Sequence, residues 1–471
     1  MNTIDTDYLV VGAGAAGMAF VDALIADGDA EVVMVDRQYR PGGHWNHAYP
    51  FVRLHQPSAI YGVNSRRLGT DSIDALGSDA GLYERATGAE ICGYFQQVLN
   101  QTLLPSGQVR FFGMSDYLGD WKHDHVFRSR MTGTCTRVNV RKKVVDTTYL
   151  QATVPATHKP AFTVDGGVRF CPAGGIVDQV EPPGGYTVLG GGKTAMDVCY
   201  WLLAHGVDPE RIRWVRPRDT WALSRRGFQP LDLMHLTIGE FAAALRALAE
   251  AESLDDLYRR LEAGGQLRRF DKTVVPTMFR GAILSDAEFD ALVQIKRVVR
   301  KGHVKRITSD RILLAEGEVE TGLDELHVDC TASGFRSNPA IPIFGPACIT
   351  TQGLVGGFTT FSAALIGYVE AVRGDDREKN ALLQPVSPLN NPIDWINAYM
   401  GFLRIADLQA GAGGHQDLAE WLDRARLNLT GGMSRHMDDP RIVNALDDIA
   451  QCRDAAVENG RRLLETMNVP V

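Results

Sequence analysis

Two glycine-rich loops hold residues whose types and spacing suit dinucleotide binding. The first, GAGAAG at 12–17, lies between an apolar run and a stretch with helical character. In such a loop Gly12 permits a tight turn, Gly14 lets the backbone approach a pyrophosphate, and Gly17 lets the helix pack on the strand. The free N–H groups at the start of the helix would hold the pyrophosphate.

An acidic residue, Asp36, ends the next apolar run, VVMVD. A carboxylate there accepts hydrogen bonds from both ribose hydroxyls and repels a 2'-phosphate. A glycine turn without a ligand is the alternative, but strand, loop, helix, strand and acid together favour a nucleotide. The cofactor-binding candidates of this unit are Gly12, Gly14, Ala15, Ala16, Gly17, Asp36 and Arg37.

The second loop, GGGKTA at 190–195, repeats the pattern with Ala195 in the third place. Arg216 stands at the end of its second strand, where the first unit has Asp36. Guanidinium groups suit the 2'-phosphate of NADP, which favours NADP(H) over NAD(H). A solvated arginine edge is the alternative. The candidates here are Gly190, Gly192, Lys193, Thr194, Ala195, Arg216, Arg218 and Arg225.

Each loop needs a strand before it and a helix and strand after it. The segments DYLVVGAG, AGMAFVDALIADG and AEVVMVDR predict the first such unit, and GYTVLGGGKTAMDVCYWLLAHG with RIRWVRPRD predicts the second. The predicted fold class is therefore α/β with two Rossmann-like domains. Residues 228–300 predict a helical insert and residues 385–471 a helical tail, which would cover an active site or form a homodimer contact.

Bulk composition excludes several classes of protein. The 471 residues have a formal net charge of −8, so the overall charge gives no reason to expect binding to nucleic acid or to an anionic membrane. No run approaches the roughly 20 apolar residues of a membrane span, and acidic residues stand where a secretory signal would be basic. Seven cysteines occur without a CxxC pair, which indicates a cytoplasmic protein and argues against a dithiol reductase. No metal site is expected.

Further motifs resemble those of a known family. The run VGAGAAG, then VVMVDR, then PGGHW is similar to the FAD fingerprint and GGxW loop of flavoproteins with two dinucleotide-binding domains. HVDCTASGFRSNP and GGFTTFSAALIGYVEA are similar to that family's return turn and to its helix facing the flavin pyrimidine. The chain resembles most the flavin-containing and Baeyer-Villiger monooxygenases, as a divergent branch.

The resemblance implies a domain plan with the NADP domain inserted into the FAD domain. The FAD domain would comprise 1–165 and 310–384, and the NADP domain 166–309. The helical region 385–471 would follow them in the chain. It also implies further cofactor-binding residues along the flavin: Gly43, His44, Trp45, Met114, Gly334, Phe358 and Thr359. Three polar residues after the GGxW loop are the catalytic candidates: Asn64, His55 and Gln56.

The activity that the resemblance implies is oxygen insertion. NADPH would reduce FAD, molecular oxygen would form a C4a-peroxyflavin, and a small organic molecule would receive one oxygen atom. The family's FxGxxxH motif reads FCPAGGI here, with Pro172 and Ile176 in the Gly and His places. Two alternatives therefore stay open: an NADPH-dependent flavin reductase or dehydrogenase without oxygen insertion, and a non-catalytic dinucleotide sensor.

Overall fold

A computed structural model describes residues 2–26 and 28–466 of the chain. Its first sheet has the strand order β3–β2–β1–β6–β5–β4, with β19 beside β6. All its neighbouring strands pair in parallel except β4 with β5 and β5 with β6. Their bounds are β1 (Asn2–Val11), β2 (Val32–Val35), β3 (Val109–Phe112), β4 (Ser115–Tyr117), β5 (Val126–Ser129), β6 (Cys135–Asp146) and β19 (Cys348–Thr350).

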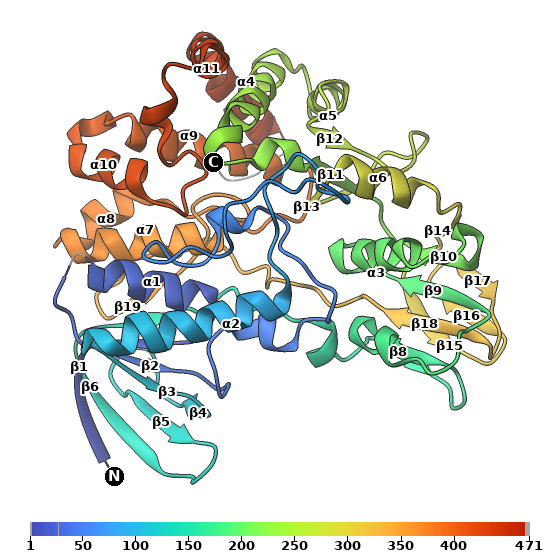
Figure 1. Ribbon diagram of the computed structural model, residues 1–471, viewed down its shortest axis with the longest axis horizontal. Helices are drawn as coiled ribbons and strands as arrows, with labels where there is room; N and C mark the ends of the chain where they lie inside the picture. The colour runs from blue at the N-terminus through green and yellow to red at the C-terminus, as the bar shows by residue number, and fades with distance from the viewer. Residues whose placement is uncertain (1, 27, 467–471) are drawn as a thin grey trace.

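Three helices lie above this sheet in Figure 1. They are α1 (Ala15–Ala26), α2 (Gly88–Val98) and α7 (Thr359–Val372). α1 and α7 cross so closely that a Cβ at Gly367 would lie 2.4 Å from the carbonyl oxygen of Phe20. Two segments far apart in the chain therefore build one unit.

The second sheet is entirely parallel, with the order β14–β10–β9–β18–β8. Helices α3 (Lys193–Ala204) and α6 (Asp286–Val293) accompany it at the right of Figure 1. The α/β class with two Rossmann-like units is confirmed. Its strands are β8 (Phe170–Pro172), β9 (Gly185–Leu189), β10 (Ile212–Val215), β14 (Arg297–Val299) and β18 (Glu325–Asp329).

The chain returns to the first sheet later than predicted. β18 is fully buried and pairs with both β9 and β8, so it belongs to the second sheet. The predicted boundary at 310 instead falls inside a small sheet of β7 (Thr163–Val164), β15 (Val304–Ile307), β16 (Arg311–Leu314) and β17 (Gly317–Glu320). A short buried strand carries the same apolar pattern in either sheet, so the pattern alone could not assign it.

The insert and the tail pack together. The insert at 228–300 contains α4 (Met234–Glu250), α5 (Leu254–Ala263) and α6, and its strands β12 (Leu267–Arg268) and β13 (Met278–Leu284) form a sheet with β11 (Thr220–Ser224), which precedes the insert. The tail is helical as predicted, and residues 467–471 lie outside the described part. Its α11 packs along α4 at the top of Figure 1. The tail helices are α9 (Asp394–Gln409), α10 (Gln416–Arg424) and α11 (Pro440–Thr466), and α8 (Asp376–Leu382) precedes the tail.

Candidate functional site

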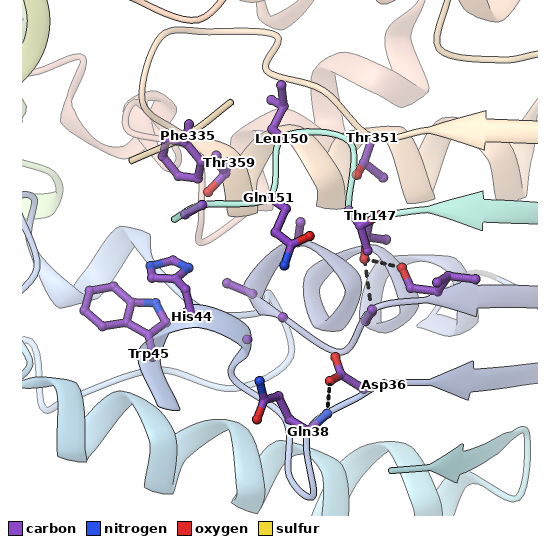
Figure 2. Close-up of a pocket in the computed structure, with 18 of the residues that line it drawn as sticks. Asp36, Gln38, His44, Trp45, Thr147, Leu150, Gln151, Phe335, Thr351 and Thr359 are labelled. Atoms are coloured by element: carbon purple, nitrogen blue, oxygen red, sulfur yellow. Dashed lines mark hydrogen bonds between the residues drawn. The ribbon is translucent and has the colours of Figure 1, made fainter. Parts of the chain in front are cut away.

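A cavity of about 570 Å³ opens where strands of the first sheet end. Its lining includes the residues that directly follow β1, β2, β6 and β19, which are Gly12, Asp36, Thr147 and Thr351. In a parallel sheet these carboxyl ends meet at one edge, which is where such folds bind ligands. Figure 2 shows Asp36 and Gln38 on one side of this cavity and His44, Trp45, Phe335 and Thr359 on the other.

The first glycine loop has the close contacts that its three glycines predict. Gly12 has a φ of 105°, and a Cβ at Gly17 would lie 2.1 Å from the carbonyl oxygen of Gly12. A Cβ at Gly43 would lie 2.9 Å from the Cα of Gly14, so the two loops touch through bare backbone. α1 begins at Ala15, and both Ala15 and Ala16 line the cavity. The free N–H groups of its first turn therefore suit a phosphate there.

Asp36 lies at the cavity wall with its carboxylate held in place. One oxygen accepts the backbone N–H of Ala13 at 2.6 Å and the other that of Gln38 at 2.7 Å. Asp36 is only 8% exposed, and this burial raises its pKa although the two backbone donors oppose the shift. Each oxygen keeps a lone pair for a ribose hydroxyl. Arg37 lines the same part of the cavity.

The GGHW loop forms a short 3₁₀ turn, Gly43–His47, at the other end of the cavity. Burial lowers the pKa of His44 to about 4, so its imidazole is neutral at physiological pH. The indole N–H of Trp45 donates to the hydroxyl of Tyr61 at 2.7 Å. Phe335 packs edge-on against His44. These rings make a flat-walled, uncharged compartment that suits an aromatic ring system.

Two of the three catalytic candidates line the cavity. His55 and Gln56 belong to its wall, and Arg225 donates to the backbone carbonyl of His55 at 3.1 Å. Burial, followed by the nearby charges of Lys193 and Arg225, holds the pKa of His55 well below its usual value. His55 is therefore neutral at physiological pH and serves as a hydrogen-bonding group rather than as a cationic acid.

The third catalytic candidate, Asn64, lies outside the cavity. Its side-chain oxygen accepts the backbone N–H of Leu427 at 3.1 Å, which ties the loop after the GGxW motif to the tail. The prediction that Asn64 faces the cofactor is corrected accordingly. Residue type and approximate spacing suggested Asn64, but they do not determine in which direction its amide points, which depends on tertiary contacts.

Three further predicted residues stand just behind the cavity lining. Met114, at a φ of 51°, donates its N–H to the backbone carbonyl of Gln38. It directly precedes β4, whose residues line the cavity. Gly334, at a φ of 71°, pairs with Thr153 and presents Phe335. Phe358 is buried before α7, whereas Thr359 lines the cavity. Each of the three predicted residues is thus followed in the chain by a residue that lines the cavity.

Several lining residues were not predicted at all. They are Gln38, Tyr61, Thr147, Gln151, Phe335 and Thr351. Thr147 and Thr351 come directly after β6 and β19, and Gln151 lies in the loop that follows β6, so the rule that ligands bind at the carboxyl ends of parallel strands could have found them. Tyr61 lies within the polar stretch that follows the GGxW loop.

The second glycine loop has the same construction as the first. Gly190 has a φ of 128°, and a Cβ there would lie 2.6 Å from the carbonyl oxygen of Cys330. Gly192 precedes the first residue of α3, and Ala195, in the third place, is fully buried. Lys193 pairs with Asp197, which also accepts the hydroxyl of Tyr49 at 2.6 Å. Thr194 belongs to the first turn of the same helix.

Arg216 is the arginine best matched to a phosphate at this loop. It is 3% exposed, and its guanidinium lies 4.5 Å from the ring centroid of Trp214 and 5.2 Å from that of Phe270. Its Nε is 3.3 Å from Asp219, yet Nε and Nη1 have no hydrogen-bond partner among the described residues. Buried guanidinium N–H groups without acceptors favour an anion nearby. Arg218, half-buried, follows it.

Arg225 cannot serve the same phosphate. It is 0% exposed and pairs with Asp79 and, at 2.7 Å, with Glu288. Arg85 pairs with the same two carboxylates, so two arginines and two acids form a closed buried network. The prediction that Arg225 binds cofactor is therefore corrected: its charge is fully used inside the protein.

The described residues include no group of three or more His, Cys, Asp or Glu side chains arranged to hold a metal ion. Within residues 2–26 and 28–466, no helix combines the length and apolar character needed to cross a membrane.

Comparison with known proteins places the chain beside mycobacterial relatives. No protein-family model matches it. It is 45% identical over 474 residues to the uncharacterized protein Rv2000 of Mycobacterium tuberculosis (strain ATCC 25618 / H37Rv) and to the uncharacterized protein Mb2023 of Mycobacterium bovis (strain ATCC BAA-935 / AF2122/97). Each alignment covers 96% of this chain and 86% of the relative.

Solved structures with a similar fold include a flavin-containing monooxygenase from Stenotrophomonas maltophilia, with a TM-score of 0.43 at 14% identity, covering 81% of this chain and 99% of that one. An oxidized steroid monooxygenase bound to NADP has a TM-score of 0.46 at 14% identity and 78% and 86% coverage. The bacillithiol disulfide reductase Bdr from Bacillus cereus has a TM-score of 0.46 at 10% identity and 80% and 99% coverage. Likenesses this distant do not carry an activity over to the chain.

Proposed function

This chain belongs to the family of mycobacterial proteins that includes Rv2000, and we propose that it is an FAD-dependent, NADPH-consuming monooxygenase acting on a small organic molecule. The observation that carries the proposal is the cavity that runs from the carboxylate of Asp36, past the glycine loop, to the neutral rings of His44 and Trp45. A nucleotide that ends in a flat ring system has matching parts in that order.

The residues present fit FAD on two counts. The bare backbone approach of Gly14 to Gly43 leaves no side chain where a pyrophosphate would cross the loop. The lone pairs that remain on Asp36 suit two ribose hydroxyls, and its negative charge repels a 2'-phosphate. FAD, when bound, would supply the chemistry of accepting a hydride and passing electrons to oxygen.

The chain's own residues would bind the cofactor, orient it and shield its ring from water. The first turn of α1 holds the pyrophosphate and Asp36 the ribose. Trp45 and Phe335 exclude water from the ring end of the cavity. Thr359 begins α7 at the same end, where the positive pole of the helix favours negative charge on the bound ring. His55, neutral in its buried setting, donates or accepts a hydrogen bond there.

NADPH is the proposed source of the hydride. The support is the second glycine loop together with Arg216, whose buried N–H groups lack acceptors among the described residues. Arg300 pairs with the same Asp219, so two guanidinium groups share one carboxylate and the net positive charge of these three side chains favours a phosphate. Arg218 remains a second candidate for that phosphate.

One experiment tests the proposed function. The purified protein is loaded with FAD, reduced anaerobically with NADPH and then exposed to oxygen while the flavin spectrum and hydrogen peroxide are followed. We expect bleaching by NADPH and delayed reoxidation with little peroxide. Failure to bind FAD would contradict the whole proposal.

The second candidate is an NADPH-dependent flavin reductase or dehydrogenase without oxygen insertion. The specific observation in its favour is that Pro172 and Ile176 occupy the Gly and His places of the FxGxxxH motif, and Ile176 is buried in the core behind α3. Immediate reoxidation with one peroxide per flavin, in the same experiment, would select this candidate.

A further inference from the structure

The stretch from Leu54 to Tyr61 brings an unpartnered amide to the cavity. Gln56 lines it and is only 6% exposed. Neither its side-chain oxygen nor its nitrogen has a hydrogen-bond partner among the described residues. The amide faces the open cavity, where a ligand or an ordered water can supply the hydrogen bonds that the protein does not.

The hydroxyl of Tyr61 accepts a hydrogen bond but donates none within the described part of the chain. Its oxygen accepts the indole N–H of Trp45 at 2.7 Å, and no acceptor for its hydrogen exists among the described residues. Its ring packs edge-on against Trp45 and Phe95, which fixes the direction of the hydroxyl. Tyr61 is 7% exposed and lines the cavity, and burial raises its pKa, so it stays a donor at physiological pH.

The cavity wall contributed by residues 43–61 has no carboxylate, lysine or arginine side chain. Burial lowers the pKa of both His44 and His55, so these two rings are neutral, and His47 is the remaining imidazole of this wall. The lining carboxylates and guanidinium group, Asp36, Arg37 and Asp116, come from the part of the chain that follows β2 and from β4. A charged ligand group beside Gln56 and Tyr61 would therefore meet no carboxylate, lysine or arginine among the lining residues of this wall.

We propose that Tyr61 and Gln56 together hold an uncharged carbonyl or amide group. Tyr61 donates to the carbonyl oxygen, and Gln56 supplies one donor and one acceptor for the adjoining N–H and C=O. The inference rests on the proposed function, since two molecules could bring this group into the cavity: the ring of the cofactor and the organic substrate. Tyr61 and Gln56 are thus binding residues, and the substrate class they fit is neutral.

Two variants test the pair. Gln56→Met keeps the length of the side chain and removes the amide, and Tyr61→Phe removes only the hydroxyl. For each, FAD affinity is measured by flavin fluorescence, and the affinity of the FAD-loaded protein for benzamide and for benzoate by flavin difference spectra. The apo protein's thermal midpoint is recorded as well. Tyr94→Phe is the control, because the Tyr94 hydroxyl is fully partnered by Val63 and Arg66.

If the pair holds the flavin ring, the Kd for FAD rises about 3- to 10-fold in both variants. If it holds the substrate, FAD affinity is kept and the Kd for benzamide rises by that factor, while wild-type protein prefers benzamide to benzoate. In either case Gln56→Met changes the apo thermal midpoint little, since the amide faces the cavity and bonds to no other group among the described residues. Tyr94→Phe lowers the midpoint and keeps both affinities.

Unchanged affinities in both variants would overturn the inference, as would a Gln56→Met protein that is less stable yet binds normally. These results leave the proposed function standing whenever the wild-type protein binds FAD. If wild-type protein binds no FAD, the proposed function fails and the inference falls with it.

Discussion

Arg216 and Arg225 illustrate how surroundings decide the role of a residue. Both are buried arginines near the second glycine loop. Arg225 shares Asp79 and Glu288 with Arg85 in a closed network. Although burial alone would raise the pKa of Glu288, Arg225, Lys193 and Arg85 hold it well below its usual value. Arg216 instead stacks on two aromatic rings and keeps N–H groups free of described acceptors.

At the residue scale we predict that substitution of Arg216 and substitution of Arg225 have different effects. Arg216→Ala should raise the Kd for NADPH about 10-fold or more and change that for NADH little, because only NADPH has the 2'-phosphate. Titration with both nucleotides measures the ratio.

Arg225→Ala is the matched comparison. It leaves two buried carboxylates short of a partner and should lower the free energy of unfolding by about 3–5 kcal/mol, without changing the NADPH to NADH ratio. Equal losses of both nucleotides in Arg216→Ala would remove Arg216 from the phosphate site.

At the scale of elements, the first glycine loop and α1 depend on one close contact. α1 lies against β1 only because Gly17 has no Cβ to meet the carbonyl oxygen of Gly12. By contrast, Gly93 in α2 faces solvent, with nothing within 4 Å of the Cβ position. Two helical glycines therefore have opposite importance, and the motif around each, rather than the residue type, tells them apart.

Alanine at these two glycines should have effects of opposite sign. Gly17→Ala forces the helix away from the strand, and we expect unfolding to be easier by about 1–3 kcal/mol and FAD binding to weaken. Gly93→Ala should stabilise the protein by up to about 1 kcal/mol, because alanine favours the helix. Urea unfolding of both variants measures the difference, and a neutral Gly17→Ala would refute the proposed packing.

At the scale of the whole molecule, the tail joins the insert to the first unit. The side-chain N–H₂ of Asn459 on α11 donates to the carbonyl oxygens of Leu248 and Ala251, both at 2.7 Å. These carbonyls lie at the end of α4, and that of Ala251 also accepts from Arg462 at 3.2 Å. Between the first unit and the tail, the side-chain oxygen of Asn64 accepts the backbone N–H of Leu427. The tail is therefore part of the folded body.

Loss of the Asn459 amide should loosen the tail. We expect Asn459→Ala to lower the free energy of unfolding by about 1–3 kcal/mol, because the carbonyl of Leu248 loses its side-chain donor and that of Ala251 keeps only Arg462. Limited proteolysis should cut near α11 sooner, with FAD affinity unchanged. Glu458→Ala, at an exposed neighbouring position, is the control and should behave as wild type. Equal proteolysis of all three proteins would contradict a docking role for Asn459.

The sequence by itself determined both glycine loops, the strands and helices around them, and the acid after β2. These features are local: a glycine that must turn, an apolar run that must be buried and a residue at a strand end each reveal their surroundings within a few positions. Met114 and Gly334, by contrast, were candidates only because the family resemblance implied them.

Only the tertiary structure decided which side chains face each other. It placed β18 in the second sheet, turned Arg225 into a network with Asp79 and Glu288, and directed Asn64 to Leu427. It also brought Trp45 to Tyr61, whose hydroxyl was not predicted to matter. Spacing along a chain does not say what lies opposite a side chain in space, and burial, pairing and free hydrogen-bond capacity all depend on that neighbour.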